Sequence, residues 1–496
     1  MDFLDPRKKG RRRWRLILSY FVMAAVVASG TFILVYSAFG YSLNTKSGDI
    51  TQNGLLFVDS KPGGATIYLN SKPQGGQTSA RLNLPAGQYN LLLKRAGYRD
   101  WQRDFTLKKH GIGRFAYPFL IPTTPQISTL QVYSFQPGLL SQSPDRRWLL
   151  LQTASLDSRL LNFDVYDTTS LDQPKTSLAF PASLFSGLDR SSQLKEVEWS
   201  SDNRHLLVSH DFAGGSEFIM LDREAPASSF NLNAVFGLTP SAVSLRDKKF
   251  NQFYIYDQTA QTIRLANLSD HSVGPALISG VLTFKSYGPD LINYATDQNQ
   301  PADKAAIKIW DRGRSYLLSQ VPRASTYLMD AAQYQGHWYY VAGSSSASRL
   351  NIYKDPLNFL ANVAIGRALP LTFLDLLDSQ KVSISTNARF IGIQAGQNFA
   401  TYDIETETKF SYQVAVPLAS PMHWMDGHRY IGQSQGNILI ADYDGTNQQL
   451  LGTSLLAGGG YFDRSYNHLL SLAGIDNSSS TQLLSIDMRA GTDLPH

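Results

Sequence analysis

SPDRRWLLLQT (residues 143–153) followed by LLNFDVYD (160–167) is a unit that recurs through most of the chain. It consists of an apolar strand, a polar turn and a second strand ending in aspartate. Seven steps from the first such aspartate to the last cover 320 residues, a mean of about 46. Repeats of about 40–50 residues with paired strands indicate a β-propeller with one four-stranded blade per unit. The eight unit ends are Asp167, Asp222, Asp257, Asp311, Asp355, Asp403, Asp442 and Asp487.

Individual spacings between these aspartates vary from 35 to 55 residues, which leaves seven or eight blades open. Two units resemble TolB-like and WD-type propeller repeats. Residues 143–149 are similar to the Ser-Pro-Asp-Gly turn that leads into a blade strand, with Arg146 in place of glycine. Residues 440–447 are similar to the Asp-Gly-x-Asn hairpin between outer strands. We therefore expect a mainly β protein with a 7–8-bladed propeller over residues 123–496, an architecture that does not by itself fix a function.

Upstream, residues 53–122 change to shorter β-type runs such as GLLFVDS and ATIYLN. The connections SKPGG, SKPQGGQ and PAGQ are rich in proline and glycine, which favour tight turns. Six short strands in about 70 residues predict a small antiparallel β-sandwich.

This segment resembles the PEGA domain, a module of bacterial surface-layer and envelope proteins. The matching stretches are residues 54–58, 60–65, 67–70 and 84–89. Pro85-Ala86-Gly87 stands where the family has Pro-Glu-Gly. Because the matching residues mostly form turns, the resemblance implies a fold and an envelope location, and it implies no chemistry.

Residues 16–39, LILSYFVMAAVVASGTFILVYSAF, contain no charged residue over 24 positions. A helix of this length spans roughly 36 Å, enough to cross a hydrocarbon core of about 30 Å. We expect a transmembrane anchor in contact with the lipid bilayer. A cleaved secretory signal is the alternative, but its apolar region is usually only about 7–15 residues long. The residues taken as marking the anchor are Leu16, Phe21, Val27, Phe32 and Phe39.

Residues 1–15 form a basic tail that predicts the orientation of this anchor. Basic clusters beside a membrane span stay in the cytoplasm. The chain is therefore predicted to be a single-pass protein of the cell membrane, with a flexible stalk at residues 40–52 and its later domains extracytoplasmic. The topology-determining residues are Arg7, Lys8, Lys9, Arg11, Arg12, Arg13 and Arg15.

The charge and cysteine content of the chain exclude several functions. The formal net charge is +5, and residues 1–15 alone carry seven positive and two negative charges, so residues 16–496 sum to zero. No basic excess remains to neutralise phosphates, and no nucleic-acid partner is expected. The absence of cysteine excludes disulfides, thiolate metal sites and cysteine nucleophiles.

Possible metal and catalytic patterns favour structural interpretations. Asp442, Asp444 and Asn447 could suggest a calcium loop, but the spacing fails the 12-residue pattern and Asp-Gly is a strong hairpin signal. His205 with His210, and His423 with His428, are each five residues apart and would face opposite sides of a strand.

Ser143-x-Asp145 and Ser201-Asp202 lack the glycine and aromatic residue of Asp-box turns, and no positioned carboxylate pair can be nominated for a glycosidase. The sequence thus nominates no catalytic, cofactor-binding or metal-binding residue. It predicts a non-enzymatic binding or scaffold protein that presents its propeller to an envelope protein or cell-wall polymer. A propeller-type hydrolase acting on envelope glycan or peptide, and a passive structural spacer, are the alternatives.

Overall fold

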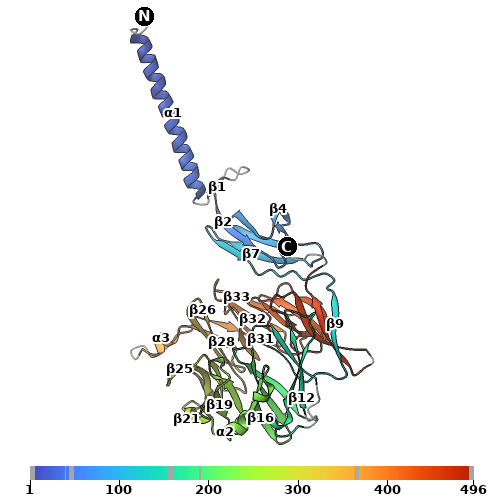
Figure 1. The fold of residues 1–496 in the computed structure, drawn as a ribbon. Helices are drawn as coiled ribbons and strands as arrows, with labels where there is room; N and C mark the ends of the chain where they lie inside the picture. Colours follow the sequence, from blue (N-terminus) through green and yellow to red (C-terminus); the bar gives the residue numbers. More distant parts are fainter. Residues whose placement is uncertain are drawn as a thin grey trace. The chain divides into compact units, whose positions relative to one another are not determined.

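The computed structural model describes residues 6–38, 41–43, 50–153, 160–188, 192–362, 366, 368–476 and 478–490. The chain divides into two compact units (Figure 1). The first contains Met1–Thr124 together with Arg489–His496, and the second contains Pro125–Met488. The chain is mainly β, and the second unit is inserted in the sequence of the first.

Helix α1 (Pro6–Ala38) is longer than the apolar stretch because it begins within the basic tail. Proline suits the first helical position, where its missing N–H leaves no hydrogen bond unmade. Within α1, Trp14–Phe32 is long and apolar enough to cross a membrane, and none of it is buried. Of the predicted anchor residues, Leu16, Phe21, Val27 and Phe32 are 50%, 71%, 60% and 67% exposed, and Phe39 lies outside the described residues.

The rest of the first unit is a β-sandwich of two four-stranded sheets. Its core contains Leu56, Ile67, Leu91 and Trp101, all nearly inaccessible to solvent. One sheet contains β1 (Tyr41–Leu43), β2 (Ile50–Val58), β5 (Ala80–Pro85) and β8 (Ile112–Phe115), and the other has the order β4 (Lys72–Gln77), β3 (Thr66–Leu69), β6 (Gly87–Lys94), β7 (Trp101–Leu107).

Three details of this unit differ from the sequence-based expectation. Strand β8 pairs with β2 in parallel, so the sandwich is not wholly antiparallel. Within the expected stalk, β1 pairs with the start of β2, with Tyr41 opposite Gln52, because pairing satisfies backbone groups that a stalk would leave to water. The propeller also ends before residue 496: the Ala490 N–H donates to the Tyr98 hydroxyl at 2.8 Å, and Ala490 packs against the sandwich core.

The second unit consists of eight four-stranded antiparallel sheets in its described residues, which are the blades of a propeller. Of the two blade numbers that the sequence left open, seven and eight, the structure has eight. In pairing order, blade 1 is β10 (Leu140–Gln142), β11 (Trp148–Gln152), β12 (Leu160–Asp167), β13 (Thr176–Pro181); blade 2 is β14 (Gln193–Trp199), β15 (His205–Phe212), β16 (Gly215–Asp222), β17 (Phe230–Asn231); blade 3 is β18 (Ala242–Leu245), β19 (Gln252–Asp257), β20 (Thr262–Asn267), β21 (Ser272–Ser279); blade 4 is β22 (Thr283–Tyr287), β23 (Leu291–Thr296), β24 (Lys304–Asp311), β25 (Arg314–Pro322).

The remaining blades follow the same order along the chain, and the last one also recruits the first strand of the unit. Blade 5 is β26 (Tyr327–Tyr334), β27 (His337–Ser344), β28 (Arg349–Lys354), β29 (Thr372–Asp375); blade 6 is β30 (Lys381–Ile384), β31 (Phe390–Ala395), β32 (Asn398–Asp403), β33 (Thr408–Gln413); blade 7 is β34 (His423–Trp424), β35 (Arg429–Ser434), β36 (Asn437–Asp442), β37 (Gln449–Thr453); blade 8 is β38 (Tyr461–Phe462), β39 (His468–Gly474), β40 (Thr481–Asp487), β9 (Ile127–Tyr133).

Strand β9 closes the ring by pairing antiparallel with β40. The apolar core is divided into clusters that lie between neighbouring blades. One of them joins blade 8 to blade 1 through Leu470, Leu472, Leu149 and Leu151. Short helical segments occur in connections: α2 (Leu232–Phe236), α3 (Leu357–Leu360), and the 3-10 turns η1 (Ala182–Leu184), η2 (Pro226–Ser228) and η3 (Arg246–Lys248).

The recurring aspartate is the last residue of the third strand in six of the eight blades, and in blade 5 Asp355 directly follows the third strand. Blade 3 is the exception: Asp257 ends the second strand, β19, and Asn267 ends the third. Four of these side chains accept hydrogen bonds from backbone N–H groups two or three residues on: Asp167, Asp222, Asp257 and Asp403. In these blades the aspartate stabilises the turn that follows its strand.

Candidate functional site

The first strand of each blade lies innermost in the propeller, because first strands of neighbouring blades contact one another directly. These inner strands surround the central channel that the propeller architecture provides. They are β10, β14, β18, β22, β26, β30, β34 and β38.

Side chains of the inner strands hydrogen-bond from blade to blade. The Tyr461 hydroxyl of blade 8 donates to the Leu140 carbonyl of blade 1 at 2.9 Å. The Trp199 indole N–H of blade 2 donates to the Ser141 hydroxyl of blade 1 at 2.7 Å. Ser244 and Ser286 join blades 3 and 4 through their hydroxyl oxygens, 2.6 Å apart. Hydrogen bonds between side chains thus connect the inner strands of neighbouring blades.

Asp330 on β26 is the centre of this network because it links three blades. Its Oδ1 accepts from the Tyr287 hydroxyl of blade 4 at 2.9 Å and from the Ala331 N–H at 3.1 Å. Its Oδ2 accepts from the Ile384 N–H of blade 6 at 3.2 Å. Lys285 on β22 lies farther away, with its Nζ 3.7 Å from Oδ1. The carboxylate is therefore held mainly by neutral donors.

Three basic side chains lie on the inner strands of blades 4, 6 and 7: Lys285, Lys381 and His423. The Lys381 ammonium donates to the Met422 carbonyl at 2.8 Å. Burial lowers the pKa of Lys381, and the positive charge of Lys285 lowers it further. Burial and the nearby Lys381 lower the pKa of His423 to about 4, so this imidazole is neutral at pH 7.

The acidic residues of the channel lie mainly on β14 of blade 2. Burial raises the pKa of Glu196, which hydrogen-bonds Ser141. Glu198 accepts from the Leu245 N–H at 2.7 Å and pairs with Lys248. Each of these carboxylates has its own structural partners, and Lys195 on the same strand pairs with Asp211.

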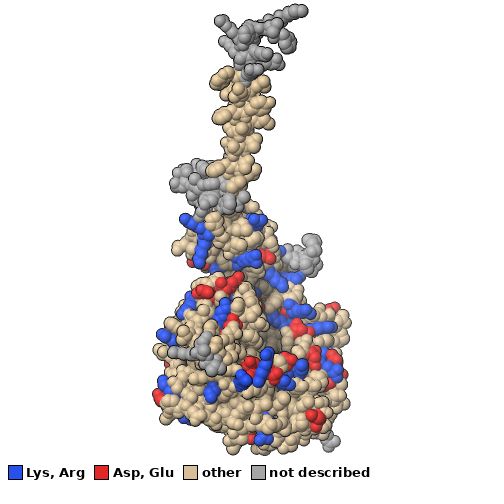
Figure 2. All heavy atoms as spheres, turned by 90° about the vertical axis from the view of Figure 1, so that its left-hand side faces the viewer, with Lys and Arg blue, Asp and Glu red and all other residues tan. Residues whose placement is uncertain are grey.

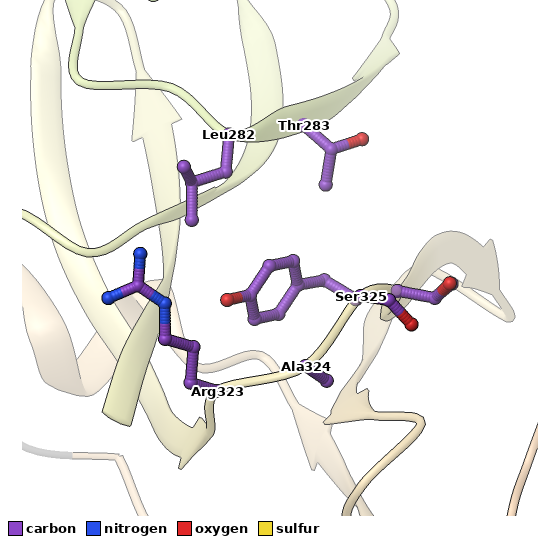
Figure 3. Close-up of a pocket in the computed structure, with 7 residues that line it drawn as sticks. Leu282, Thr283, Arg323, Ala324 and Ser325 are labelled. Atoms are coloured by element: carbon purple, nitrogen blue, oxygen red, sulfur yellow. The ribbon is translucent and has the colours of Figure 1, made fainter. Parts of the chain in front are cut away.

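A pocket of about 300 Å³ opens beside the inner strands of blades 4 and 5. Leu282 and Thr283, where the chain enters β22, lie across it from the loop that carries Arg323 and Ser325 (Figure 3). Thr283 is two residues before Lys285 on β22, so the pocket lies near the start of the strand that carries Lys285. Its lining is Leu282, Thr283, Arg323, Ala324, Ser325, Thr326 and Tyr327.

A second set of charges lies where the second and third strands of a blade meet. In blade 6, Arg389 donates from Nε and Nη2 to the two carboxylate oxygens of Asp403 at 2.9 and 2.6 Å. Arg204 and Asp222 repeat this geometry in blade 2. Arg147 donates twice to one oxygen of Asp167 in blade 1. We call these three pairs the clamps, since each ties the start of one strand to the end of the next.

The residues weighed from sequence for metal binding have structural roles. Asn447 donates to the Asp442 carboxylate at 2.8 Å, and the Gly445 N–H donates to the Asp442 carbonyl, as in a turn. His205 bonds Asp202 at 2.6 Å, and His210 bonds Glu217 at 2.8 Å. Within the described part of the chain, no three His, Cys, Asp or Glu side chains gather as a metal site would require.

Sequence reasoning missed Lys285, Asp330 and Lys381 altogether, and it considered His423 as a possible partner of His428 in a metal site. Inner strands are short, with β30 only four residues long, so periodicity is weak in them. Their contacts join residues about 45 positions apart in the sequence, and short-range sequence patterns do not predict such contacts. Over the propeller surface that Figure 2 shows, both signs of charge are interspersed, so surface charge does not mark the site either.

Comparison with known families identifies the sandwich. Residues 53–117 match the family model for the PEGA domain. This match covers the segment in which the sequence resemblance was found. No curated protein matches the chain.

Solved structures similar to the chain include several propellers. The dihydro-heme d1 dehydrogenase NirN, in complex with DHE, is 12% identical over 67% of this chain and 69% of its own, with a TM-score of 0.41. An oligogalacturonate lyase from Vibrio parahaemolyticus is 9% identical over 74% and 98%, with a TM-score of 0.37. The Cps50 (Swd1) β-propeller domain from Myceliophteria thermophila is 10% identical over 73% and 99%, with a TM-score of 0.34.

Proposed function

We propose that the chain is a membrane-anchored binding protein of the bacterial cell envelope, with its PEGA domain and propeller outside the membrane. The observation that carries this proposal is the exposure of an apolar helix directly before a PEGA domain. Phe21 and Phe32 are each more than 60% exposed on α1. Such a surface is stable in hydrocarbon and unfavourable in water.

The basic residues at the start of α1 support an N-terminus in the cytoplasm. The match to the PEGA domain over residues 53–117 supports an extracytoplasmic location for the sandwich and the propeller. The propeller then displays its channel and connecting loops to an envelope protein or a cell-wall polymer. Loops on a rigid scaffold are common contact surfaces.

We propose that the propeller binds without catalysing a reaction. Hydrolysis of a glycoside uses two carboxyl groups that flank the bond to be broken. Asp330 and Glu198, on the inner strands, are instead bonded to neighbouring blades. A nucleic-acid partner is not proposed, because residues 16–496 carry no net charge.

The test has two parts. After alkaline extraction, the full chain should stay in the membrane. Protease added outside intact cells or spheroplasts should digest the sandwich and the propeller and leave the N-terminal segment protected. The detergent-solubilised full chain, immobilised by an N-terminal tag, should retain an envelope protein or a cell-wall polymer. A chain extracted by alkali would contradict the anchor. A chain that retains nothing would favour a passive spacer, and cleavage products from a retained glycan would favour a hydrolase.

A further inference from the structure

The basic residues of the channel differ from the arginines of the clamps in their carboxylate partners. Lys285 has a half-exposed side chain, 47% accessible, and its nearest carboxylate oxygen is 3.7 Å away on Asp330. That distance is too long for a hydrogen bond. Asp330 already accepts three hydrogen bonds, from the Tyr287 hydroxyl and from two backbone N–H groups. The carboxylate is therefore shared, and it compensates Lys285 only in part.

Lys381 adds a second positive charge on the other side of Asp330. Lys381 begins β30, and the Ile384 N–H at the end of the same strand donates to Asp330. The bond from Lys381 to the Met422 carbonyl uses one of the three donors of the ammonium group. Among the described residues, no carboxylate forms an ion pair with Lys381. Lys285 and Lys381 thus lie on β22 and β30, the two inner strands that flank β26 and its Asp330.

Two like charges in a partly buried channel destabilise each other. An anion between them removes this repulsion and satisfies the remaining donors. His423 on β34 follows Met422 directly and is a neutral imidazole at pH 7, which provides a further hydrogen-bonding group without charge. The 300 Å³ pocket lies at the start of β22, where its lining residue Thr283 is two residues from the first lysine.

We propose that Lys285 and Lys381 bind an anionic group of the ligand, a carboxylate or a phosphate, at the inner strands of blades 4 and 6. This inference rests on the proposed binding function and specifies the chemistry of the ligand. Cell-wall polymers and peptides carry both groups, and both offer oxygen atoms to ammonium donors. The acidic residues of blade 2 disfavour the same anion on the opposite wall.

The experiment measures binding of two polymer probes to the detergent-solubilised full chain by biolayer interferometry at 50 mM and 300 mM salt. Polyphosphate carries phosphate groups and poly-γ-glutamate carries carboxylates. The probe that binds with higher affinity therefore shows which of the two groups the site prefers. We expect one of them to bind, with affinity at least tenfold lower at the higher salt concentration.

The double variant Lys285→Gln/Lys381→Gln should weaken this binding at least tenfold. The matched control Lys249→Gln/Lys304→Gln removes the same charge from two lysines that pair with Asp247 and Asp303, and it should change affinity less than twofold. The single variant Lys285→Gln changes a half-exposed side chain, so it tests the site even if the double variant fails to fold.

Two results would overturn the inference: wild-type chain that binds neither probe, or a Lys285→Gln chain that binds as wild type does. If the wild-type chain still retains an envelope component in either case, the anion site is wrong and the binding function stands. If it retains no envelope component, the proposed function itself has failed.

Discussion

In the clamp of blade 6, Arg389 donates two hydrogen bonds to a carboxylate whose side chain is 2% exposed, whereas in the channel Lys285 lies 3.7 Å from a carboxylate bonded to other groups. Arginine presents a fork of donors that matches both oxygens of a carboxylate, and lysine presents a single charged point. The charged groups of the clamps are paired with each other inside the blade. The channel lysines keep N–H donors that a ligand can bind.

The largest effect expected from this comparison is the loss of stability on removal of a clamp. Arg389→Ala leaves the buried Asp403 carboxylate with backbone donors only, and we expect a loss of about 3 kcal/mol in the stability of the propeller. Chemical denaturation followed by fluorescence measures this loss. Lys195→Ala, which breaks an exposed pair with Asp211, should change stability by less than about 1 kcal/mol. Equal losses of stability in Arg389→Ala and Lys195→Ala would contradict the distinction between the buried clamp and an exposed ion pair.

Glu217 extends the comparison to a carboxylate held by neutral donors and histidine. Burial acts to raise the pKa of Glu217, but hydrogen bonds from His210, Ser186 and Asn231 outweigh it and lower the pKa to about 2. A carboxylate with a lowered folded-state pKa stabilises the protein fully above its unfolded pKa. This stabilisation is lost as the pH falls from about 4.5 to about 2.

Glu217→Gln should therefore destabilise the propeller by about 2 kcal/mol at pH 7. The difference from wild type should shrink progressively between about pH 4.5 and about pH 2.5 in denaturation experiments. Glu224→Gln, at a side chain that is 52% exposed, is the matched control and should have little effect. A difference that stays constant with pH would show that Glu217 does not act through its charge.

Unlike Arg389→Ala and Glu217→Gln, the variant Lys381→Met is predicted to leave the stability of the propeller almost unchanged. It removes a partly buried charge that has a carbonyl and no carboxylate as its partner, and it retains most of the apolar stem. We expect the free energy of unfolding to change by less than about 1 kcal/mol, in either direction. A loss as large as that of Arg389→Ala would place Lys381 among the structural charges.

The smallest effect concerns a turn beside the blade 6 clamp. Ala388 has a φ of 60°, in the left-handed region that disfavours residues with a Cβ atom. Ala388→Gly should stabilise the propeller by about 0.5 kcal/mol, because relief of strain exceeds the added freedom of the unfolded chain. Ala306→Gly, in the middle of β24, should instead destabilise it. Chemical denaturation of the two variants checks whether the backbone conformation at the site decides if a change from alanine to glycine stabilises or destabilises the propeller.

The repeating aspartate predicted the propeller because it stands at or beside the end of a strand in every blade, and in four blades its side chain bonds the turn that follows. The prediction failed at blade 3 in one respect, since Asp257 forms the equivalent turn after the second strand. The turn residues of the sandwich, such as Pro85 and Gly87, likewise predicted its fold. Local turn chemistry was therefore readable from the sequence.

Long-range pairing was not readable. Strand β9 completes blade 8 across more than 300 residues, and Ala490 returns to the sandwich to bond Tyr98. The channel site depends on the same kind of contact, because Lys285, Asp330 and Lys381 come from three different blades. None of them belongs to a motif, so only the packing of neighbouring blades brings their strands together.

The most direct test compares stability and binding in the same variants. Retention of an envelope component by the detergent-solubilised full chain would be measured for wild type, for Lys285→Gln/Lys381→Gln and for Lys249→Gln/Lys304→Gln, together with the melting temperature of each. We predict that the channel variant melts within a few degrees of wild type and loses retention, while the control keeps both. Full retention by a folded channel variant would contradict the division between structural charges and ligand-binding charges.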